Sequence, residues 1–152
     1  MTQYYYISSP GRLPAGTFGA TPVSEDEPYV YNSELDAAAL FIESNYDPKT
    51  KKRFAYVPDF THKHQVSVYG NSLPIKPDNW HSCIEEKCMK LLYDYVNDAV
   101  QESGMIEICT CINGTEERGN WIKRTIYWSD ITSPYDLVLE DREICVIVNW
   151  RI

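Results

Sequence analysis

The chain has 152 residues, a length at which one hydrophobic core forms without disulfide or metal staples. Its 22 acidic and 14 basic residues give a formal net charge of -8, which disfavours direct binding to nucleic-acid phosphates. No apolar stretch approaches the roughly twenty residues that cross a membrane, so we expect neither a membrane span nor membrane binding. Five cysteines without framework spacing, and a first segment unlike a signal peptide, predict free thiols in a cytoplasmic protein.

The first third of the chain predicts a strand, a long loop and a short helix. Residues 4–8 are aromatic and β-branched, as in a strand, and residues 10–28 are rich in Pro and Gly and then acidic, as in a loop. Ser33 and Asp36 have the spacing of a helix cap. The apolar residues that follow have helical spacing: Leu35, Ala38, Ala39 and Ile42. We therefore expect a helix that ends near Asn45.

The middle of the chain predicts a hairpin and the longest helix. Strands at 53–57 and 65–69 are close enough in sequence to pair with each other. A helix is expected over 80–103, because Ser82 and Glu85 form a capping box and Gly104 stands where a left-handed cap belongs. Its expected apolar face contains Trp80, Ile84, Cys88, Leu91, Leu92, Tyr95 and Ala99, and Glu85 is expected on the solvent side.

The last third predicts three strands, at 105–112, 121–128 and 143–150, the last of which is apolar on both faces and therefore central. Cys109 and Cys111 alternate along a strand and are expected on one side of it as small core residues. Together the elements predict a single α+β domain over 1–152. Two helices pack on a mainly antiparallel sheet of five to six strands, in the order βαββαβββ.

Acidic and aromatic residues of the predicted loops and turns carry the leading functional hypothesis. Held together, they would present carboxylates and rings to a protein with a basic surface, as an inhibitor or immunity factor does. The candidate residues are Arg12, Glu25, Asp26, Glu27, Tyr29, Tyr31, Tyr127 and Tyr135. Ordinary solvated charge explains the same acidic residues, and that alternative stays open.

Two further hypotheses remain. A nucleotide-like small molecule would stack on Tyr or Trp rings, with Arg12, Lys123 or Arg124 facing its charge, and the 10–28 loop would contact it. A zinc-assisted hydrolase would take its ligands from His62, His64, His81 and Cys83, although their spacing matches no standard zinc motif. Loop and cap positions explain these four residues better, so no cofactor is expected. The chain also lacks the common catalytic motifs, which disfavours an enzyme.

Overall fold

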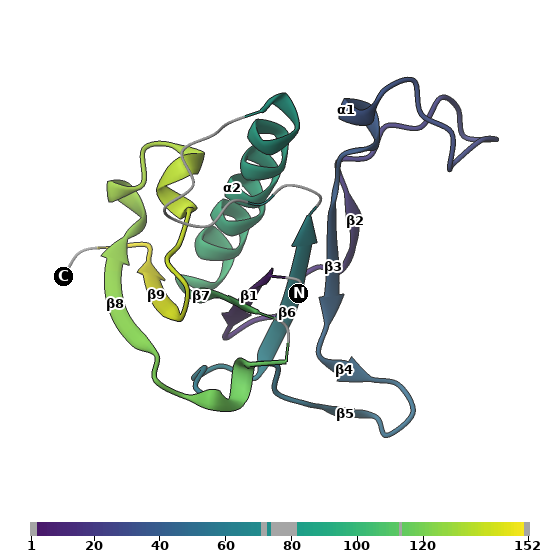
Figure 1. The fold of residues 1–152 in the computed structure, drawn as a ribbon. Coiled ribbons are helices and arrows are strands. Elements are labelled where there is room, and N and C mark those ends of the chain that lie inside the picture. Colours follow the sequence, from purple (N-terminus) through teal and green to yellow (C-terminus); the bar gives the residue numbers. More distant parts are fainter. Residues whose placement is uncertain (1–2, 71–72, 74–81, 113, 151–152) are drawn as a thin grey trace.

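The computed structural model describes residues 3–70, 73, 82–112 and 114–150. Within this part, seven strands form one sheet in the order β2-β3-β6-β1-β7-β9-β8, and helix α2 lies across one face of it (Figure 1). Neighbouring strands are antiparallel except β8 and β9, which are parallel. The predicted α+β class and the mainly antiparallel sheet are confirmed. The predicted strand number and element order are wrong.

The strands of this sheet are β1 (Gln3–Ser9), β2 (Gly16–Phe18), β3 (Leu40–Ser44), β6 (His64–Gly70), β7 (Met105–Ile112), β8 (Ile122–Tyr127) and β9 (Glu143–Val148). A separate hairpin consists of β4 (Tyr46–Asp47) and β5 (Lys52–Arg53). The helices are α1 (Glu34–Ala37) and α2 (Cys83–Ser103), with 3-10 turns η1 (Glu116–Arg118), η2 (Trp128–Asp130) and η3 (Pro134–Leu137).

Both predicted caps of α2 are present. The Ser82 hydroxyl accepts a hydrogen bond from the Glu85 amide at 3.1 Å. At the other end, Gly104 has a left-handed φ of 82° and its amide donates to the Val100 carbonyl at 2.8 Å. Each cap satisfies backbone groups that the helix itself leaves without a partner. The predicted start at Trp80 lies outside the described residues.

The buried stripe of α2 is rotated from the predicted one. Its members are Glu85, Cys88, Met89, Leu92, Tyr95, Val96, Ala99 and Val100. Leu91 is only partly buried, whereas Glu85, expected in solvent, is 7% exposed. The stripe packs on the apolar residues of one sheet face, among them Ile7, Val68 and Ile108. This layer forms the main core.

The predicted helix that ends near Asn45 is wrong beyond its first turn. The cap itself is confirmed, because the Ser33 hydroxyl accepts from the Asp36 amide at 3.1 Å. After Ala37 the chain turns into β3, where Leu40 and Ile42 are buried and Phe41 between them is exposed. β3 pairs with β6 on one side and with β2 on the other, which satisfies backbone groups at both edges of the strand, so sheet formation prevails over the helical spacing.

The predicted hairpin of 53–57 with 65–69 is also wrong. Strand β6 lies between β1 and β3, so Val68 already has partners on both sides and neither edge is available to a third strand. Residues 54–57 form no strand. The Gln65 side chain, 4% exposed, instead donates to the Val57 carbonyl and accepts from the Val57 amide, at 3.3 Å and 3.0 Å. One buried amide thus holds this segment against the sheet.

Three smaller predictions need correction. The 10–28 segment contains the edge strand β2, which pairs with β3. The strand predicted at 121–128 ends at Tyr127, and Trp128 begins η2. The strand predicted at 143–150 ends at Val148 and lies between β7 and β8, so its interior position in the sheet is confirmed.

Candidate binding surface on the open face of the sheet

The sheet face opposite α2 is polar and aromatic. Side chains alternate along each strand, so the residues between the core positions of β3, β6 and β1 point to this side. The register places Glu43 beside Ser67 and Ser67 beside Tyr6, while Phe41 lies beside Tyr69. Residues from three strands therefore come together on one surface.

Six aromatic rings form a continuous chain of contacts across this face, which we call the aromatic row. In order, its members are Phe41, Tyr69, Tyr4, Tyr6, Tyr56 and Phe54. Successive ring centroids lie 6.2, 5.5, 6.2, 5.6 and 4.8 Å apart. These separations lie in the range of favourable aromatic pairs. The rings therefore support one another as a preformed surface.

The aromatic row is exposed at both ends and buried in the middle. Phe41, Tyr69 and Phe54 are 40%, 41% and 46% exposed, whereas Tyr6 is 1% exposed. Large apolar groups left in water at neighbouring positions are uncommon unless a partner covers them. The two ends of the row therefore offer the apolar contacts of a binding surface.

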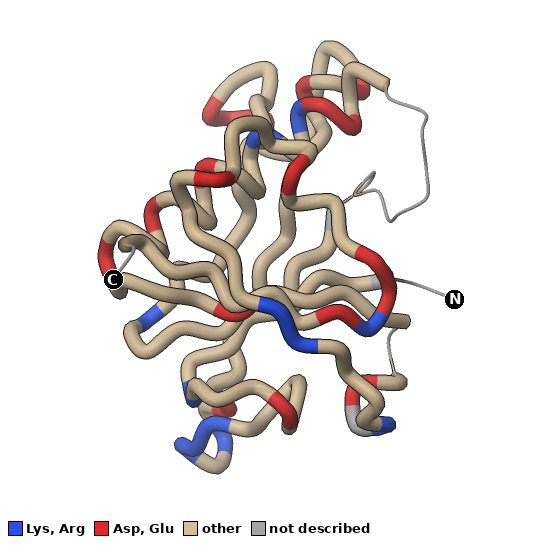
Figure 2. Tube along the Cα trace, turned by 90° about the vertical axis from the view of Figure 1, so that its left-hand side faces the viewer, with Lys and Arg blue, Asp and Glu red and all other residues tan. Residues whose placement is uncertain are grey.

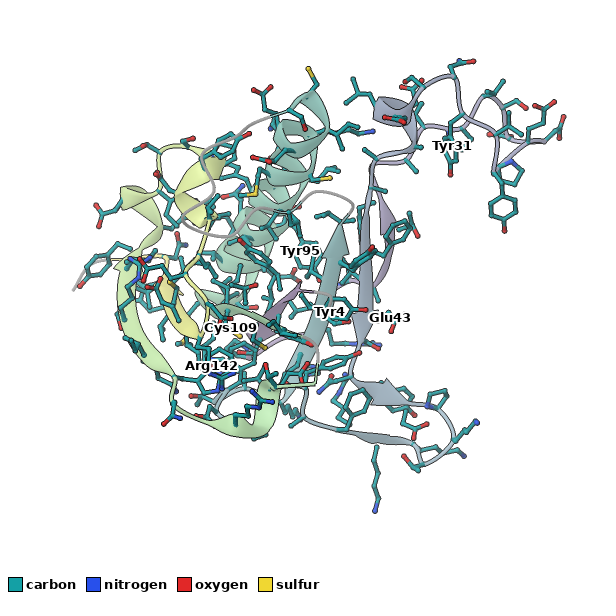
Figure 3. All side chains as sticks on the ribbon, in the orientation of Figure 1. Tyr4, Tyr31, Glu43, Tyr95, Cys109 and Arg142 are labelled. Carbon is teal, nitrogen blue, oxygen red and sulfur yellow. The ribbon has the colours of Figure 1, made fainter. Side chains whose placement is uncertain are left out.

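A hollow of about 460 Å³ lies along the row and contains two carboxylates. Glu43 and Glu116 line it together with Tyr4, Tyr6 and Tyr56. Figure 3 shows Tyr4 and Glu43 on the sheet and Tyr31 far from both, in the loop before α1. Glu43 is exposed. Negative charge is thus placed directly beside the rings.

Glu116 is held in place by hydrogen bonds. The Tyr6 hydroxyl donates to its carboxylate, and the Gly114 amide donates to both carboxylate oxygens at 3.0 Å. Burial, and then the Glu116 carboxylate, raise the pKa of Tyr6. Burial alone would raise the pKa of Glu116, but the bonds from Tyr6 and Gly114 outweigh it and the pKa is lowered. Glu116 is therefore a structural anion, and Glu43 is the carboxylate available to a partner.

The rest of this face is covered by the chain itself. Val57 and Phe60 pack on Cys109, Cys111 and Ile144 in a second, smaller core. Burial raises the pKa of Cys111 to about 11 and that of Cys109 well above its ordinary value. Both thiols are protonated at neutral pH, so their predicted role as core residues is confirmed. None of the five cysteines, all of which lie in the described part of the chain, forms a disulfide.

The structure does not bring the predicted binding residues together. Glu25, Asp26, Glu27 and Tyr29 lie in the exposed loop before α1, where Tyr31 donates to the Pro28 carbonyl at 3.3 Å. The other three lie elsewhere. Tyr127 ends the opposite edge strand β8, Tyr135 packs on the main core from η3, and Arg12 lies in the segment that follows β1.

The predicted metal ligands are also separated. His64 begins β6 at one end of the sheet, and the exposed Cys83 begins α2 at the other end (Figure 1). His62 lies in the loop before β6, and His81 falls outside the described residues. Within the described residues, no three His, Cys, Asp or Glu side chains form a group that could hold a metal ion.

Charge is distributed unevenly over the molecule. Figure 2 shows Lys and Arg gathered at the lower end, where Figure 1 places the β4–β5 hairpin, while Asp and Glu prevail at the end that carries α1. The basic run from Lys49 to Arg53 belongs to this hairpin, and within the run only Arg53 is partly buried.

Sequence inspection missed the aromatic row, although a signal for it exists. Tyr4 and Tyr6, Phe41 and Glu43, and Ser67 and Tyr69 each alternate with buried residues on their strand. Such alternation predicts that one face of a strand is polar or exposed. Which strands are neighbours cannot be read from it, and only the neighbours create the row.

The fold and this surface define an α+β protein whose mixed seven-stranded sheet carries a helix on one face and an aromatic surface on the other. No protein-family model, curated protein or solved structure matches the chain. Among the described residues, no helix combines the length and the apolar character needed to cross a bilayer.

Proposed function

We propose that this protein is an interaction module that binds a partner protein through the aromatic row and Glu43, in the manner of an inhibitor or immunity factor. The single observation that carries the proposal is the chain of six rings across the sheet, with three well-exposed members. Interfaces owe most of their binding energy to a few aromatic and Arg residues. A preformed row supplies such anchors at low entropic cost.

The electrostatics favour a partner that presents Arg or Lys. Glu43 stands exposed in the hollow beside Tyr4, and the whole chain carries a net charge of -8. A guanidinium group could pair with the carboxylate and lie on a Tyr ring at the same time. The chain's own Arg53 already lies 5.6 Å from the centre of the Tyr46 ring. We therefore expect salt-sensitive association with a basic surface.

The test measures retention of the partner by variants of the surface. The wild-type protein is used to isolate its partner from the native host, and the purified pair is then titrated. Phe41→Ser and Glu43→Lys should each weaken binding about tenfold or more. Tyr29→Ser is the matched control, because Tyr29 is 89% exposed and belongs to the loop before α1.

Each outcome decides between the surfaces. Loss of binding in the first two variants with full binding by Tyr29→Ser supports the aromatic row. Loss in Tyr29→Ser alone would overturn it in favour of the acidic loop, and a partner indifferent to Phe41→Ser and Glu43→Lys would also overturn it. Melting temperatures of the free variants separate lost contacts from lost folding.

A further inference from the structure

A second recess lies on the other side of the sheet, near the end of α2. Its volume is about 520 Å³, which falls within the range of small-molecule sites. The segment after β1, the ends of β3 and β6, the β4–β5 hairpin and the last turn of α2 all contribute to it. Its polar and aromatic lining includes Arg12, Ser44, Tyr46, Arg53, His64 and Glu102. We call it the basic pocket.

The basic pocket is preorganised around Arg53. Its Nη1 donates to Asn45 Oδ1 at 3.0 Å, and its guanidinium lies 5.6 Å from the centre of the Tyr46 ring. Asn45 is 1% exposed, and its Nδ2 donates to the Lys63 carbonyl at 2.7 Å. The buried Asn45 amide, whose oxygen and nitrogen both form hydrogen bonds, thus orients the Arg53 guanidinium toward the recess. Fixed donors of this kind bind anions with little loss of side-chain freedom.

Arg12 is placed by contacts on either side of it. The Tyr95 hydroxyl, projecting from α2, donates to the Pro14 carbonyl at 2.6 Å. Before Arg12, the Ser9 hydroxyl donates to the Ser103 hydroxyl at 2.9 Å and accepts from the Gly11 amide at 3.1 Å. The segment that carries Arg12 is therefore tied to the helix and is not a free loop.

His64 shows that the local potential is positive. Its pKa is lowered, first by burial and then by the charges of Arg53, Lys63 and Arg12. Its Nδ1 is buried and has no hydrogen-bond partner among the residues that the structure describes. In a chain of net charge -8, this concentration of cations is an exception that needs an explanation.

We propose that the basic pocket binds a small organic phosphate, with its phosphate between Arg12 and Arg53 and its body against Tyr46 and Pro14. Guanidinium groups match phosphate oxygens with paired hydrogen bonds. Phosphate bound there would offset the repulsion between Arg12 and Arg53. The pocket shares no lining residue with the hollow of the aromatic row, so this site is independent of the proposed protein interface.

The test titrates AMP, adenosine and inorganic phosphate into the full chain by calorimetry and thermal unfolding. We expect AMP to bind and to raise the melting temperature, inorganic phosphate to bind more weakly, and adenosine not to bind. Arg12→Gln and Arg53→Lys should each weaken AMP binding about tenfold, since both remove a guanidinium. Lys49→Gln is the control, because Lys49 is an exposed cation of the same hairpin outside the pocket.

Three results would overturn the proposal. The first is no binding of AMP or phosphate at millimolar concentration. The second is a competitor that binds as tightly as AMP: adenosine would assign the site to the nucleoside, and inorganic phosphate would show that the organic part makes no contribution. The third is equal weakening by Lys49→Gln and Arg12→Gln, which would indicate diffuse charge. Unfolding curves without ligand show whether Arg53→Lys preserves the fold. Arg12→Gln tests the site independently, because it leaves the hydrogen bond between Arg53 and Asn45 unchanged.

Discussion

The hydroxyl of Tyr6, in the first strand, donates a hydrogen bond to the carboxylate of Glu116, which lies 110 positions later in the chain. This bond ties the turn after β7 to the open face of the sheet. The same turn is held from its other side by Arg142, which donates to the Thr115 carbonyl at 3.0 Å. One wall of the hollow beside the aromatic row therefore depends on contacts between distant segments.

Replacing Tyr6 by Phe should lower the free energy of unfolding by about 1–2 kcal/mol at neutral pH, because the carboxylate loses a donor. The lowered pKa of Glu116 means that its contribution is present above the ordinary value of 4.5 and is lost as the pH falls through the folded pKa. The variant should therefore lose less stability on acidification than the wild type. Urea unfolding at neutral and acidic pH measures both effects, with Tyr31→Phe as the control. An unchanged acid dependence would contradict this role of the bond.

Replacing Arg142 by Ala should lower the free energy of unfolding by about 2–3 kcal/mol, since several backbone hydrogen bonds are lost together. Arg142 also donates to the Gly119 carbonyl, and its guanidinium lies 4.3 Å from the centre of the Trp121 ring. Red-shifted tryptophan emission should accompany the loss as Trp121 becomes more hydrated. Arg118→Ala removes an exposed cation of the same turn and should change neither the free energy of unfolding nor the tryptophan emission.

Replacing Leu92 by Ala should cost about 2–5 kcal/mol, because Leu92 is completely buried under the sheet. The sequence alone places Leu91 on the same apolar face as Leu92 and so predicts a similar cost for Leu91→Ala. The structure places Leu91 at the margin of the core, so Leu91→Ala should cost distinctly less. Denaturant unfolding of the two variants compares them directly. Equal costs would mean that the helix is rotated from the position described.

Replacing Gly104 by Ala should destabilise the protein for two separate reasons. Its left-handed φ of 82° disfavours a side chain, and an added Cβ would lie 2.6 Å from an atom of the Trp150 ring. Gly114→Ala is the matched control, since Gly114 has a φ of 95° but no atom near an added Cβ. The cost of Gly114→Ala, about 1 kcal/mol, measures the effect of the left-handed backbone alone. Melting temperatures of the two variants give the additional destabilisation of Gly104→Ala, which measures the contact between the added Cβ and the Trp150 ring.

The basic pocket should bind sulfate more tightly as the pH falls. Burial and the facing cations Arg53, Lys63 and Arg12 lower the pKa of His64, so the ring of the free protein is protonated only below its usual value of 6.5. A bound dianion raises that pKa, and binding therefore takes up a proton. Glu102, which also lines the pocket, carries a carboxylate that repels a bound anion. Sulfate keeps its double charge, so calorimetric titrations between about pH 8 and pH 5.5 isolate the histidine.

His64→Gln should flatten this pH dependence and leave weak binding in place. In the free protein the lowered pKa has the opposite consequence, because the unfolded chain binds the proton more readily as the pH falls through 6.5. The wild type should lose stability over that range, and His64→Gln should lose less. Sulfate affinity that does not change with pH would contradict a histidine facing the anion.

The strongest local signals in the sequence predicted the elements whose formation depends mainly on residues close together in the chain. Both caps of α2 are where the spacing of Ser82, Glu85 and Gly104 places them, because capping needs only neighbouring residues. The strand at 105–112 followed from its β-rich composition, and the shared side of Cys109 and Cys111 followed from their alternation along it. The α+β class rests on these elements.

Tertiary pairing decided what local patterns left ambiguous. The helical spacing of Leu35 to Ile42 did not decide the structure, because from Leu40 onward the backbone pairs with β6 on one side and β2 on the other. The expected hairpin failed because both edges of β6 were already occupied, by β1 and β3. Neither outcome can be predicted from a few consecutive residues, because each depends on which distant strands pair.

Both candidate sites follow from this strand order. The sequence by itself determined that Tyr4, Phe41, Tyr69, Arg12 and Arg53 are present, and that alternate residues of a strand share one of its faces. Only the order β3-β6-β1 joined the rings into a row, and only the β4–β5 hairpin placed Arg53 in the same recess as Arg12. The physical reason is that side-chain direction is set locally, whereas the identity of the neighbouring strand is set by which distant segments bury the most surface together.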